Sequence, residues 1–520
     1  MTAINLIQFK GELPQVDPKK LPLGNAVTAL NCHLSSGSLE PVKGLGAAIH
    51  TFPAAAFETL TRHPYRSAAT NWLQFSTDVD LVRGPIANDK WDRVYWTDGV
   101  YPKIQTSEQS ATSSLRLGIP APASAPVIGA SSGVAEEGAI EVDCAYICTY
   151  VSKFGEEGPP SVASAITQKL DGMTVQLTSL PGNPSGEYDI DRIRLYRSES
   201  GATFNYLSDV LIGVSTFDDS AKSDTLLAPM VTEDWIAPDD SMVGLTYMGN
   251  GILAGFFGNT LCFSEPYYPH AWPVGYQLAF KDNIVGIGMS ASGLVVTTTA
   301  EPWVIMGSHP NAMAQQMLDS PYACVSKRSM VDMGSYVLYA SNDGLVAAAG
   351  GDAKLVSANV IDSDDFKALN PSTWKAFRFN DRYFVVHDTG CLSFSPSEGL
   401  KHFTIAAKAA FFDLEESELY LLLSDKTVCK WGDGSELSAT WRSGIFTLPP
   451  RVPMACARVD ADGPCTLNVY FDGALLMAHA VGDDNMFRLP AGRFRELEVE
   501  IVASSTVHSV SLASSPEELR

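Results

Sequence analysis

The stretch Tyr336-Val337-Leu338-Tyr339-Ala340-Ser341-Asn342-Asp343-Gly344-Leu345-Val346-Ala347-Ala348 consists of two strand-forming runs separated by an Asp-Gly turn. Aromatic and β-branched residues favour strands, and an Asp-Gly pair accepts the positive φ angles of a tight hairpin turn. No long stretch holds a helical period of apolar residues, so we expect short helices only near 312–318 and 362–369. The sequence therefore predicts an all-β protein. Further Asp-Gly pairs, which extend this pattern along the chain, begin at Asp98, Asp171, Asp433, Asp462 and Asp472.

A repeating unit runs from about residue 240 to 432. Each unit offers a first strand, a turn, and a second strand that begins with glycine, as in 284–289 followed by 293–298. The period is irregular, at roughly 40 to 45 residues, which is the length of a four-stranded propeller blade. We therefore predict an irregular β-propeller over 240–432, to which residues 1–116 contribute further blades.

Two other segments have a strand pattern that differs from this repeat. After a linker that contains Pro120, Pro122 and Pro126, residues 127–227 have the strand length and spacing of an inserted β-sandwich. Residues 436–520 form the last segment, where Leu, Val and Ile alternate with Glu over 496–501, as in a half-buried strand. We predict a small C-terminal β-sandwich over 436–520.

Composition and charge exclude several classes of protein. The 520 residues carry a net charge of -23, whereas a sequence-specific DNA-binding protein needs a basic patch. From charge alone, the first interpretation is that the acidic surface confers solubility. The alternative is an acidic wall, which repels phosphate, so DNA passes it without adhering. No apolar run is long enough to span a bilayer, and the first eleven residues do not resemble a secretory signal. We expect folding in a cytoplasm, with the nine cysteines reduced and buried.

No catalytic or metal-binding motif is found in the sequence. It contains no H-E-x-x-H, no G-x-S-x-G, no phosphate-binding P-loop and no zinc-spaced Cys/His set, and we predict no enzyme activity, no cofactor and no metal. His63 and His387 lie among apolar neighbours and are expected to be structural. A propeller glycosidase is the enzymatic alternative, because 341–345 partly matches an aspartate-box turn. For 460–463 a hairpin turn is preferred to a Ca²⁺ loop.

Several motifs resemble known families. The segment 145–160, with its Gly-Glu-Glu-Gly-Pro-Pro turn, is similar to fibronectin type III and immunoglobulin-like modules, and lacks the disulfide of the latter. The chain as a whole resembles the tail nozzle, or tail tubular protein B-like, virion proteins of short-tailed phages. Arg83 and Trp96 lie within this match, where we expect a salt-bridged surface residue and a core residue. The match is carried by Phe9-Lys10-Gly11-Glu12-Leu13-Pro14, Asn31-Cys32-His33-Leu34, Val82-Arg83-Gly84-Pro85, Arg93-Val94-Tyr95-Trp96-Thr97, Trp441-Arg442-Ser443, Arg488-Leu489-Pro490-Ala491-Gly492 and Leu512 to Leu519.

The resemblance implies a virion structural protein that is assembled in the host cytoplasm. Such nozzles form a ring, commonly a hexamer, below the tail adaptor, and their axial channel conducts genomic DNA without binding a specific sequence. Family members are often longer and carry domains that bind tail fibres, so fibre attachment is left open for this chain. A receptor-binding or connector protein of the tail is the alternative, and the aromatic loop 265–273 is the segment that would favour receptor binding.

Three acidic doublets are the candidate channel-lining residues. A channel that lets phosphates slide needs acidic or small polar side chains on the loops that face its axis. A solvated turn is the alternative for each doublet. The candidates are Asp218 and Asp219, Asp239 and Asp240, and Asp364 and Asp365.

Overall fold

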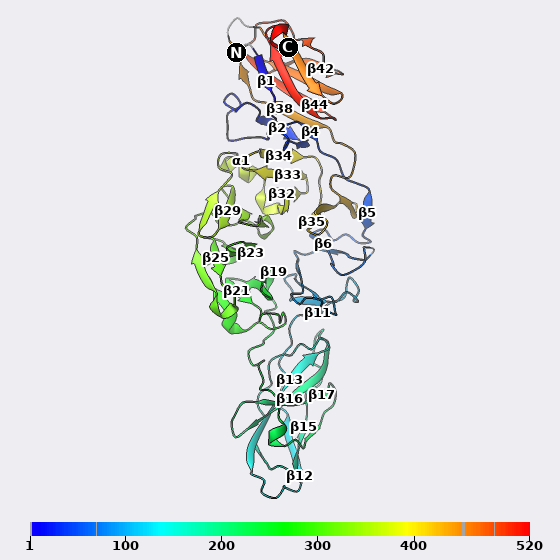
Figure 1. The fold of residues 1–520 in the computed structure, drawn as a ribbon, viewed down its shortest axis with the longest axis vertical. Coiled ribbons are helices and arrows are strands. Elements are labelled where there is room, and N and C mark those ends of the chain that lie inside the picture. The colour runs from blue at the N-terminus through cyan, green and yellow to red at the C-terminus, as the bar shows by residue number, and fades with distance from the viewer. Residues whose placement is uncertain (1–2, 69, 450–452, 483, 520) are drawn as a thin grey trace.

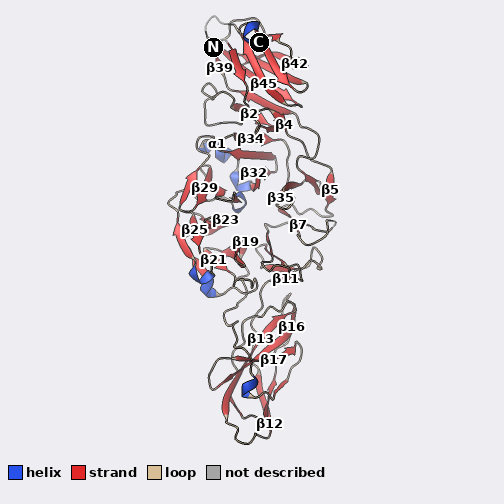
Figure 2. Cartoon of the chain, in the orientation of Figure 1, coloured by secondary structure: helices blue, strands red, loops and turns tan. Residues whose placement is uncertain are grey.

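The computed structural model describes residues 3–68, 70–449, 453–482 and 484–519, and the chain is almost entirely β-structure (Figures 1 and 2). The molecule is elongated, with a sandwich that holds both termini at the top of Figure 1, a ring of small sheets in the middle, and a second sandwich at the bottom. The all-β prediction is confirmed. Helix α1 (Ser363–Ala368) lies where a short helix was predicted, and the Asp362 side chain accepts hydrogen bonds from its first amides.

The second predicted helix, over 312–318, is wrong. Residues Ala314–Met317 form strand β26, which pairs antiparallel with β25 (Trp303–Met306). Ala, Gln and Met are good helix formers, but pairing with a neighbouring strand outweighs this weak preference. The other helical turns in the described residues are short 3₁₀ segments: η1 (Ser223–Thr225), η2 (Val274–Tyr276), η3 (Pro310–Ala312), η4 (Lys327–Ser329), η5 (Pro371–Thr373) and η6 (Pro516–Leu519).

The middle part is a propeller. Its innermost strands contact one another in the order β8, β19, β23, β27, β31, β35, β6. The ring continues from β6 to β8 through the Val79 amide, just before β8, which donates to the Thr59 hydroxyl of β6 at 3.0 Å. The sheets that radiate from them are β6 (Thr59–Arg62) with β7 (Trp72–Phe75); β8 (Asp80–Arg83), β9 (Val94–Thr97), β10 (Lys103–Gln105) and β11 (Leu115–Arg116); β19 (Val243–Gly249), β20 (Ile252–Phe257), β21 (Thr260–Phe263) and β22 (Gln277–Ala279); β23 (Ile284–Ser290), β24 (Gly293–Thr298), β25 and β26; β27 (Val331–Asp332), β28 (Val337–Ala340), β29 (Leu345–Ala349) and β30 (Asp352–Leu355); β31 (Lys375–Phe379), β32 (Arg382–His387), β33 (Gly390–Ser395) and β34 (Gly399–Phe403); and β35 (Ala409–Asp413), β36 (Glu418–Leu422) and β37 (Thr427–Lys430) with β5 (Ala48–Thr51).

The apolar cores of the propeller lie between adjacent sheets. Phe256 of β20 and Leu294 of β24 share one core, whereas Val295 of β24 and Val346 of β29 share the next. Alternate residues of a strand point to opposite faces, so each blade buries both of its faces against its neighbours. Strand β5 comes from the N-terminal region and completes the last blade by pairing with β37. The ring is therefore closed by segments that are far apart in the sequence.

The lower sandwich consists of two facing sheets. It lies between β11 and β19 in the sequence, where an inserted module was predicted over 127–227. Its core includes Tyr146, Val175 and Leu195. One sheet is β12 (Val127–Gly133), β15 (Met173–Thr178) and β18 (Phe217–Asp219), and the other is β14 (Thr167–Lys169), β13 (Val142–Ser152), β16 (Ile190–Glu199) and β17 (Asn205–Leu211).

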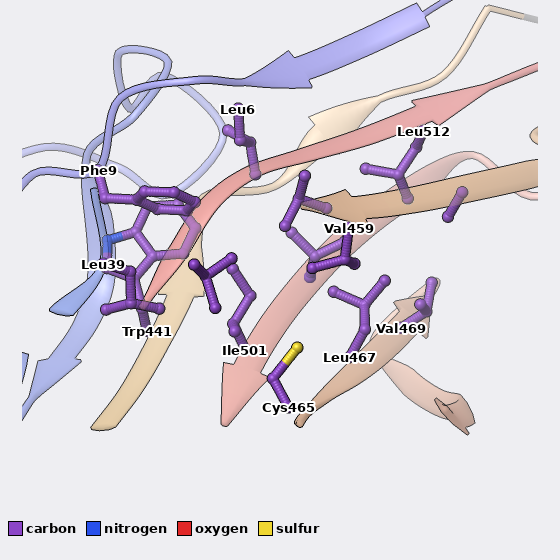
Figure 3. Packing of buried hydrophobic residues seen from close by; sticks show 14 of the residues in the cluster. Leu6, Phe9, Leu39, Trp441, Val459, Cys465, Leu467, Val469, Ile501 and Leu512 are labelled. Atoms are coloured by element: carbon purple, nitrogen blue, oxygen red, sulfur yellow. The ribbon is translucent and has the colours of Figure 1, made fainter. Parts of the chain in front are cut away.

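The upper sandwich combines both ends of the chain, and this differs from the expectation that residues 1–116 belong to the propeller. Strand β1 pairs with β45 and β2 pairs with β38. Phe9 packs edge-on against Trp441 in the shared core, with ring centroids 5.0 Å apart (Figure 3). The strands are β1 (Ala3–Leu6), β45 (Val507–Ala513), β40 (Cys456–Ala461) and β43 (Phe487–Arg488) in one sheet; β2 (Ala26–Leu30), β38 (Ala439–Ser443), β44 (Glu496–Ala503), β41 (Cys465–Phe471), β42 (Ala474–Val481) and β39 (Phe446–Thr447) in the other; and the small pair β3 (Cys32–His33) and β4 (Glu40–Pro41).

The upper sandwich and the propeller share one continuous sheet. Strand β2 pairs in parallel with β34, the outermost strand of a blade, at Leu30 and His402. Next to this junction the Gly11 amide donates to the Glu398 carbonyl at 2.7 Å. A Cβ atom at position 11 would lie 2.5 Å from that carbonyl oxygen, so only glycine fits. The junction is thus built from backbone pairing and close packing.

Candidate functional site

A cluster of four charged side chains crosses the axis of the propeller. Lys327 and Arg328 lie on η4, before β27, and face Asp78 and Asp80 at the start of β8. Lys327 Nζ is 2.9 Å from Asp78 Oδ2, and an Arg328 guanidinium nitrogen is 3.1 Å from Asp80 Oδ1. Lys327 also pairs with Asp80, and Arg328 with Asp78. We call these four residues the axial cluster.

The axial cluster joins strands that are not neighbours in the ring. The sheets of β19 and β23 separate β8 from β27 on one side, and those of β31, β35 and β6 separate them on the other. Arg328 also donates to the Val79 carbonyl at 2.7 Å. The ion pairs therefore connect opposite sides of the propeller ring across its middle.

The Asp78 carboxylate of the axial cluster is held in the ionised form. Burial alone would raise the pKa of the Asp78 carboxyl, but Arg328 and Lys327 outweigh it and lower that pKa. The Lys327 and Asp80 side chains are only 17% and 15% exposed, so their charges are poorly screened by solvent. A glycosidase needs one carboxylic acid whose pKa is raised so that it can donate a proton. Asp78 has the opposite shift.

A cavity of about 930 Å³ lies beside the axial cluster. Lys327, Arg328, Lys375, Lys408 and His387 line it together with apolar and acidic residues. The cations are already partnered: Lys375 Nζ donates to the carbonyls of residues 57, 58 and 408, and Lys408 Nζ lies 2.8 Å from an Asp388 oxygen. These contacts give the cavity a structural lining rather than a set of free ligand-binding charges.

A second charged cluster joins the propeller to the lower sandwich. Arg93 of the propeller lies 2.6 Å from Asp89 and 2.7 Å from Glu156, which follows β13 of the sandwich. His270, in the loop after β21, donates from Nε2 to the Glu157 carbonyl at 3.2 Å. We call Asp89, Arg93, Glu156 and His270 the junction cluster.

Burial is the main cause of the pKa shifts of Glu156 and His270 in the junction cluster. It raises the pKa of the Glu156 carboxyl to about 7, although Arg93 opposes this shift. It lowers the pKa of His270 to about 3, so this imidazole is neutral over the physiological range and its Nε2 proton is available to the backbone. Because these groups are shielded from water, the junction cluster fastens the sandwich to the propeller instead of binding a soluble ligand.

The three acidic doublets lie in separate parts of the molecule. Asp218 and Asp219 belong to β18 of the lower sandwich, Asp239 and Asp240 precede β19 of the propeller, and Asp364 and Asp365 lie in the first turn of α1. All are exposed except Asp219, which is fully buried and accepts hydrogen bonds from Arg197 and the Tyr146 hydroxyl, both at 2.7 Å. Asp219 thus presents no charge to a surface of this chain, and the structure does not bring the doublets together within one subunit.

Other residues singled out from the sequence have structural contacts. Arg83 forms an exposed ion pair with Glu415 at 2.6 Å, and Trp96 is buried, as expected. His63 is fully buried, as expected of a structural histidine. Its Nε2 atom, however, has no hydrogen-bond partner among the described residues. His387 is half-buried, with Nδ1 2.9 Å from the Thr389 hydroxyl.

The aromatic loop 265–273 is only partly exposed. Trp272 is buried in the propeller core and donates from its indole nitrogen to the Pro269 carbonyl at 2.8 Å, while Tyr267 and Tyr268 stay about half exposed. The loop also supplies His270 to the junction cluster, so it lies at the contact between the propeller and the lower sandwich. This burial weakens the expectation that it forms a receptor-binding surface.

Sequence reasoning missed the axial and junction clusters. Asp78 and Asp80 are two residues apart on an extended chain, which places them on one face, and Lys327-Arg328 is an adjacent basic pair in an acidic protein. These patterns mark charged residues but not their pairing across the ring. Among the described residues no group of three or more His, Cys, Asp or Glu side chains is placed to hold a metal ion, and none of the helices has the length and apolar character needed to cross a bilayer.

Comparisons with known proteins give only distant similarities. No family model matches the chain, and no curated protein matches it. Similar solved structures include Hsv2 of Kluyvelomyces marxianus, at 10% identity and a TM-score of 0.25 over 61% of this chain and 95% of that chain. Sqt1 of Saccharomyces cerevisiae has 8% identity and a TM-score of 0.27 over 74% and 99% of the two chains. An exo-beta-1,3-galactanase of Phanerochaete chrysosporium has 7% identity and a TM-score of 0.19 over 90% and 100%. Scores this low carry no argument about activity, and the sheet order and the cores between blades define the propeller here.

Proposed function

We propose that this chain is a virion structural protein, a subunit of the ring that forms the distal tail tube, or nozzle, through which phage DNA leaves the particle. The observation that carries the proposal is that the upper sandwich, the propeller and the lower sandwich are connected end to end by backbone pairing and buried ion pairs. The upper sandwich shares a sheet with the propeller through β2 and β34, and the junction cluster fastens the lower sandwich at the other end. A tube wall needs elongated subunits of this kind, which keep their length and shape under load.

The passage for DNA lies between subunits in this proposal. The axial cluster spans the middle of the propeller of each chain, and the proposed path of the DNA is the middle of a ring of chains instead. The net charge of -23 suits such a wall, because carboxylates repel phosphates and keep DNA from adhering. Asp218, Asp239, Asp240, Asp364 and Asp365 are the exposed doublet residues available to face the channel.

The proposed role is not catalytic. The axial carboxylates are neutralised by Lys327 and Arg328, and Glu156, the acid with a raised pKa, is buried against Arg93 without access to a substrate. A tail adaptor above the ring, and in some phages tail fibres, complete the set of proposed partners. This set follows from the resemblance of the sequence to nozzle proteins.

Receptor binding by the lower sandwich is a second candidate function. Val134, Ile140, Val162 and Ile166 are between 70% and 86% exposed there, which leaves apolar side chains available to a partner surface. Replacing Ile140 and Ile166 with serine distinguishes the two roles. A receptor-binding role predicts particles that assemble but no longer adsorb to the host, whereas a purely structural role predicts normal adsorption.

Electron microscopy of the purified chain tests the proposed ring. We expect closed rings with an open centre wide enough for duplex DNA, built from side-by-side copies of the elongated subunit. Particles that stay single chains at every concentration, both alone and in the presence of tail adaptor, would contradict the proposal.

A further inference from the structure

The outermost strand of the upper sandwich, β42, carries no formal charge along its free edge. Its sequence Ala474-Leu475-Leu476-Met477-Ala478-His479-Ala480-Val481 contains no Asp, Glu, Lys or Arg, and it lies at the free end of its sheet. Leu475 and Leu476 are 50% and 47% exposed. The free edge of a strand presents unpaired N–H and C=O groups, and natural proteins usually guard it with charge, proline or a bulge. Strand β42 has neither charge nor proline, and its pairing with β41 shifts register between Leu475 and Met477.

Another edge of the same chain shows such protection. Strand β30 is the outer strand of its blade, and the exposed side chains of Asp352 and Lys354 form an ion pair across it at 2.5 Å. Charged side chains of this kind disfavour pairing with a second chain. Strand β42 has no such charged pair, so its edge lacks electrostatic protection.

The opposite side of the sandwich carries a second edge without charge. Strand β1 (Ala3–Leu6) ends the other sheet, exposes Asn5, and is followed by Ile7, which is 69% exposed. The His479 ring of β42 stacks on Phe487 of β43 with centroids 3.8 Å apart, and β43 lies at the far end of the sheet from β1. Strands β1 and β42 therefore bound opposite sides, as Figure 1 shows.

The propeller repeats this arrangement. Its outer strands β5 and β26 also lack Asp, Glu, Lys and Arg, and expose Ile49 at 50% and Met317 at 49%. In Figure 1 strand β5 lies on the same side as β42, and β25, the neighbour of β26, lies on the side of β1. Each long side of the molecule thus has two edges free of formal charge, one in the sandwich and one in the propeller.

We propose that these two sides join successive copies of the chain, with β42 of one copy pairing with β1 of the next to continue the sheet. Main-chain hydrogen bonds supply the affinity in such strand addition. Because the two edges are different and lie on opposite sides, the contact is head-to-tail and closes into a ring when the rotation per subunit divides a full turn. The inference rests on the proposed ring and specifies how its subunits bind one another.

A charge placed on β42 tests the contact. Leu476→Lys is expected to convert assembled protein to single chains in mass photometry, at concentrations where the natural chain is a multimer. Leu211→Lys is the matched control, because Leu211 ends the edge strand β17 of the lower sandwich and is 71% exposed. The control should stay assembled, and both variants should melt like the natural chain. An assembled Leu476→Lys ring overturns the inference while leaving the proposed ring intact, and a natural chain that never assembles contradicts the ring itself.

Cysteine cross-linking identifies the partner edge. The nine native cysteines are all buried, so they give little background. The Asn5→Cys/Leu476→Cys double variant should form disulfide-linked chains of many copies under mild oxidation, and neither single variant should. Dimers formed by Leu476→Cys alone would show that β42 pairs with itself, which overturns the head-to-tail contact.

Discussion

Lys327 and Asp78 meet on the axis of the propeller, with Nζ 2.9 Å from Oδ2, although they come from sheets on opposite sides of the ring. This pair and its neighbours Arg328 and Asp80 hold the sheets together where the apolar cores between blades do not reach. The axial cluster therefore ties opposite sides of the ring together.

Removing one cation of the axial cluster should make the folded chain less stable. Lys327→Met leaves Asp80 short of a partner in a poorly solvated place, and we expect the free energy of unfolding to fall by about 2 kcal/mol. Urea unfolding followed by tryptophan fluorescence measures the change. Lys354→Met, which removes the exposed pair with Asp352, is the control and should leave the transition where it is. Equal behaviour of the two variants would show that the axial cluster contributes no stability.

Glu398 should make the stability depend on pH in the acid range. Burial opposes its ionisation, but hydrogen bonds from Arg382 and Lys401 outweigh burial and lower the pKa of the Glu398 carboxyl to about 2. A carboxyl whose pKa is lower in the folded chain stabilises it above the unfolded pKa of about 4.3, and this stabilisation is lost as the pH falls towards 2.

The variant Glu398→Gln should therefore be less stable than the natural chain at pH 7, by about 2 kcal/mol. The difference should shrink between about pH 4.5 and pH 2, because protonation removes the same charge from the natural chain. Thermal unfolding of both proteins across this range measures it. A difference that stays constant with pH would contradict the role of the Glu398 charge.

Arg197 should be essential for the lower sandwich. Its side chain and that of Asp219 are both fully buried and lie 2.7 Å apart. Arg197→Met leaves the Asp219 carboxylate without its main counter-charge, and we expect a loss of about 3 kcal/mol or more. The double variant Arg197→Met/Asp219→Asn should recover part of this loss, because no unpaired charge remains. Hydrogen exchange of the β13 and β16 amides reports on the sandwich itself, and a double variant no better than the single one would refute the assignment.

The α1 doublet offers a test of the channel. If Asp364 and Asp365 face passing DNA, replacing both with lysine should leave particles assembled but slow DNA ejection, most strongly at low salt, where the new charges attract phosphate. The rate of DNA release from purified particles at two salt concentrations measures this effect. Ejection that is normal at both concentrations would remove this doublet from the channel wall.

Local patterns in the sequence predicted those parts of the fold that depend on neighbouring residues. Leu497, Val499 and Ile501 are buried in β44, as their alternation with glutamate predicted, and the Asp343-Gly344 turn joins β28 to β29. The same alternation predicted that Glu498 faces outward, but Glu498 is buried and pairs with Arg442. The pattern of Ala314–Met317 was misleading, because the strand at these positions depends on pairing with Trp303 rather than on local preference.

Local sequence patterns could not predict which distant segments pair with one another. Nothing near Ala3–Leu6 indicates that its partner is Val507–Ala513, and the pairing of Asp78 with Lys327 depends on how the ring closes. The acidic doublets show the same limit, since Asp218 and Asp219 are adjacent in the sequence yet one is exposed and the other is in the core. Charge alone identifies candidate residues, while burial and partners are decided by tertiary structure.

The position of this chain in the virion tests the central proposal most directly. If the proposal is correct, gold-labelled antibodies against the chain, viewed by electron microscopy on phage particles that contain it, should mark the distal end of the tail in intact virions. Absence of label from virions that contain all other tail proteins, or label confined to the capsid, would contradict the assignment of this chain to the tail nozzle.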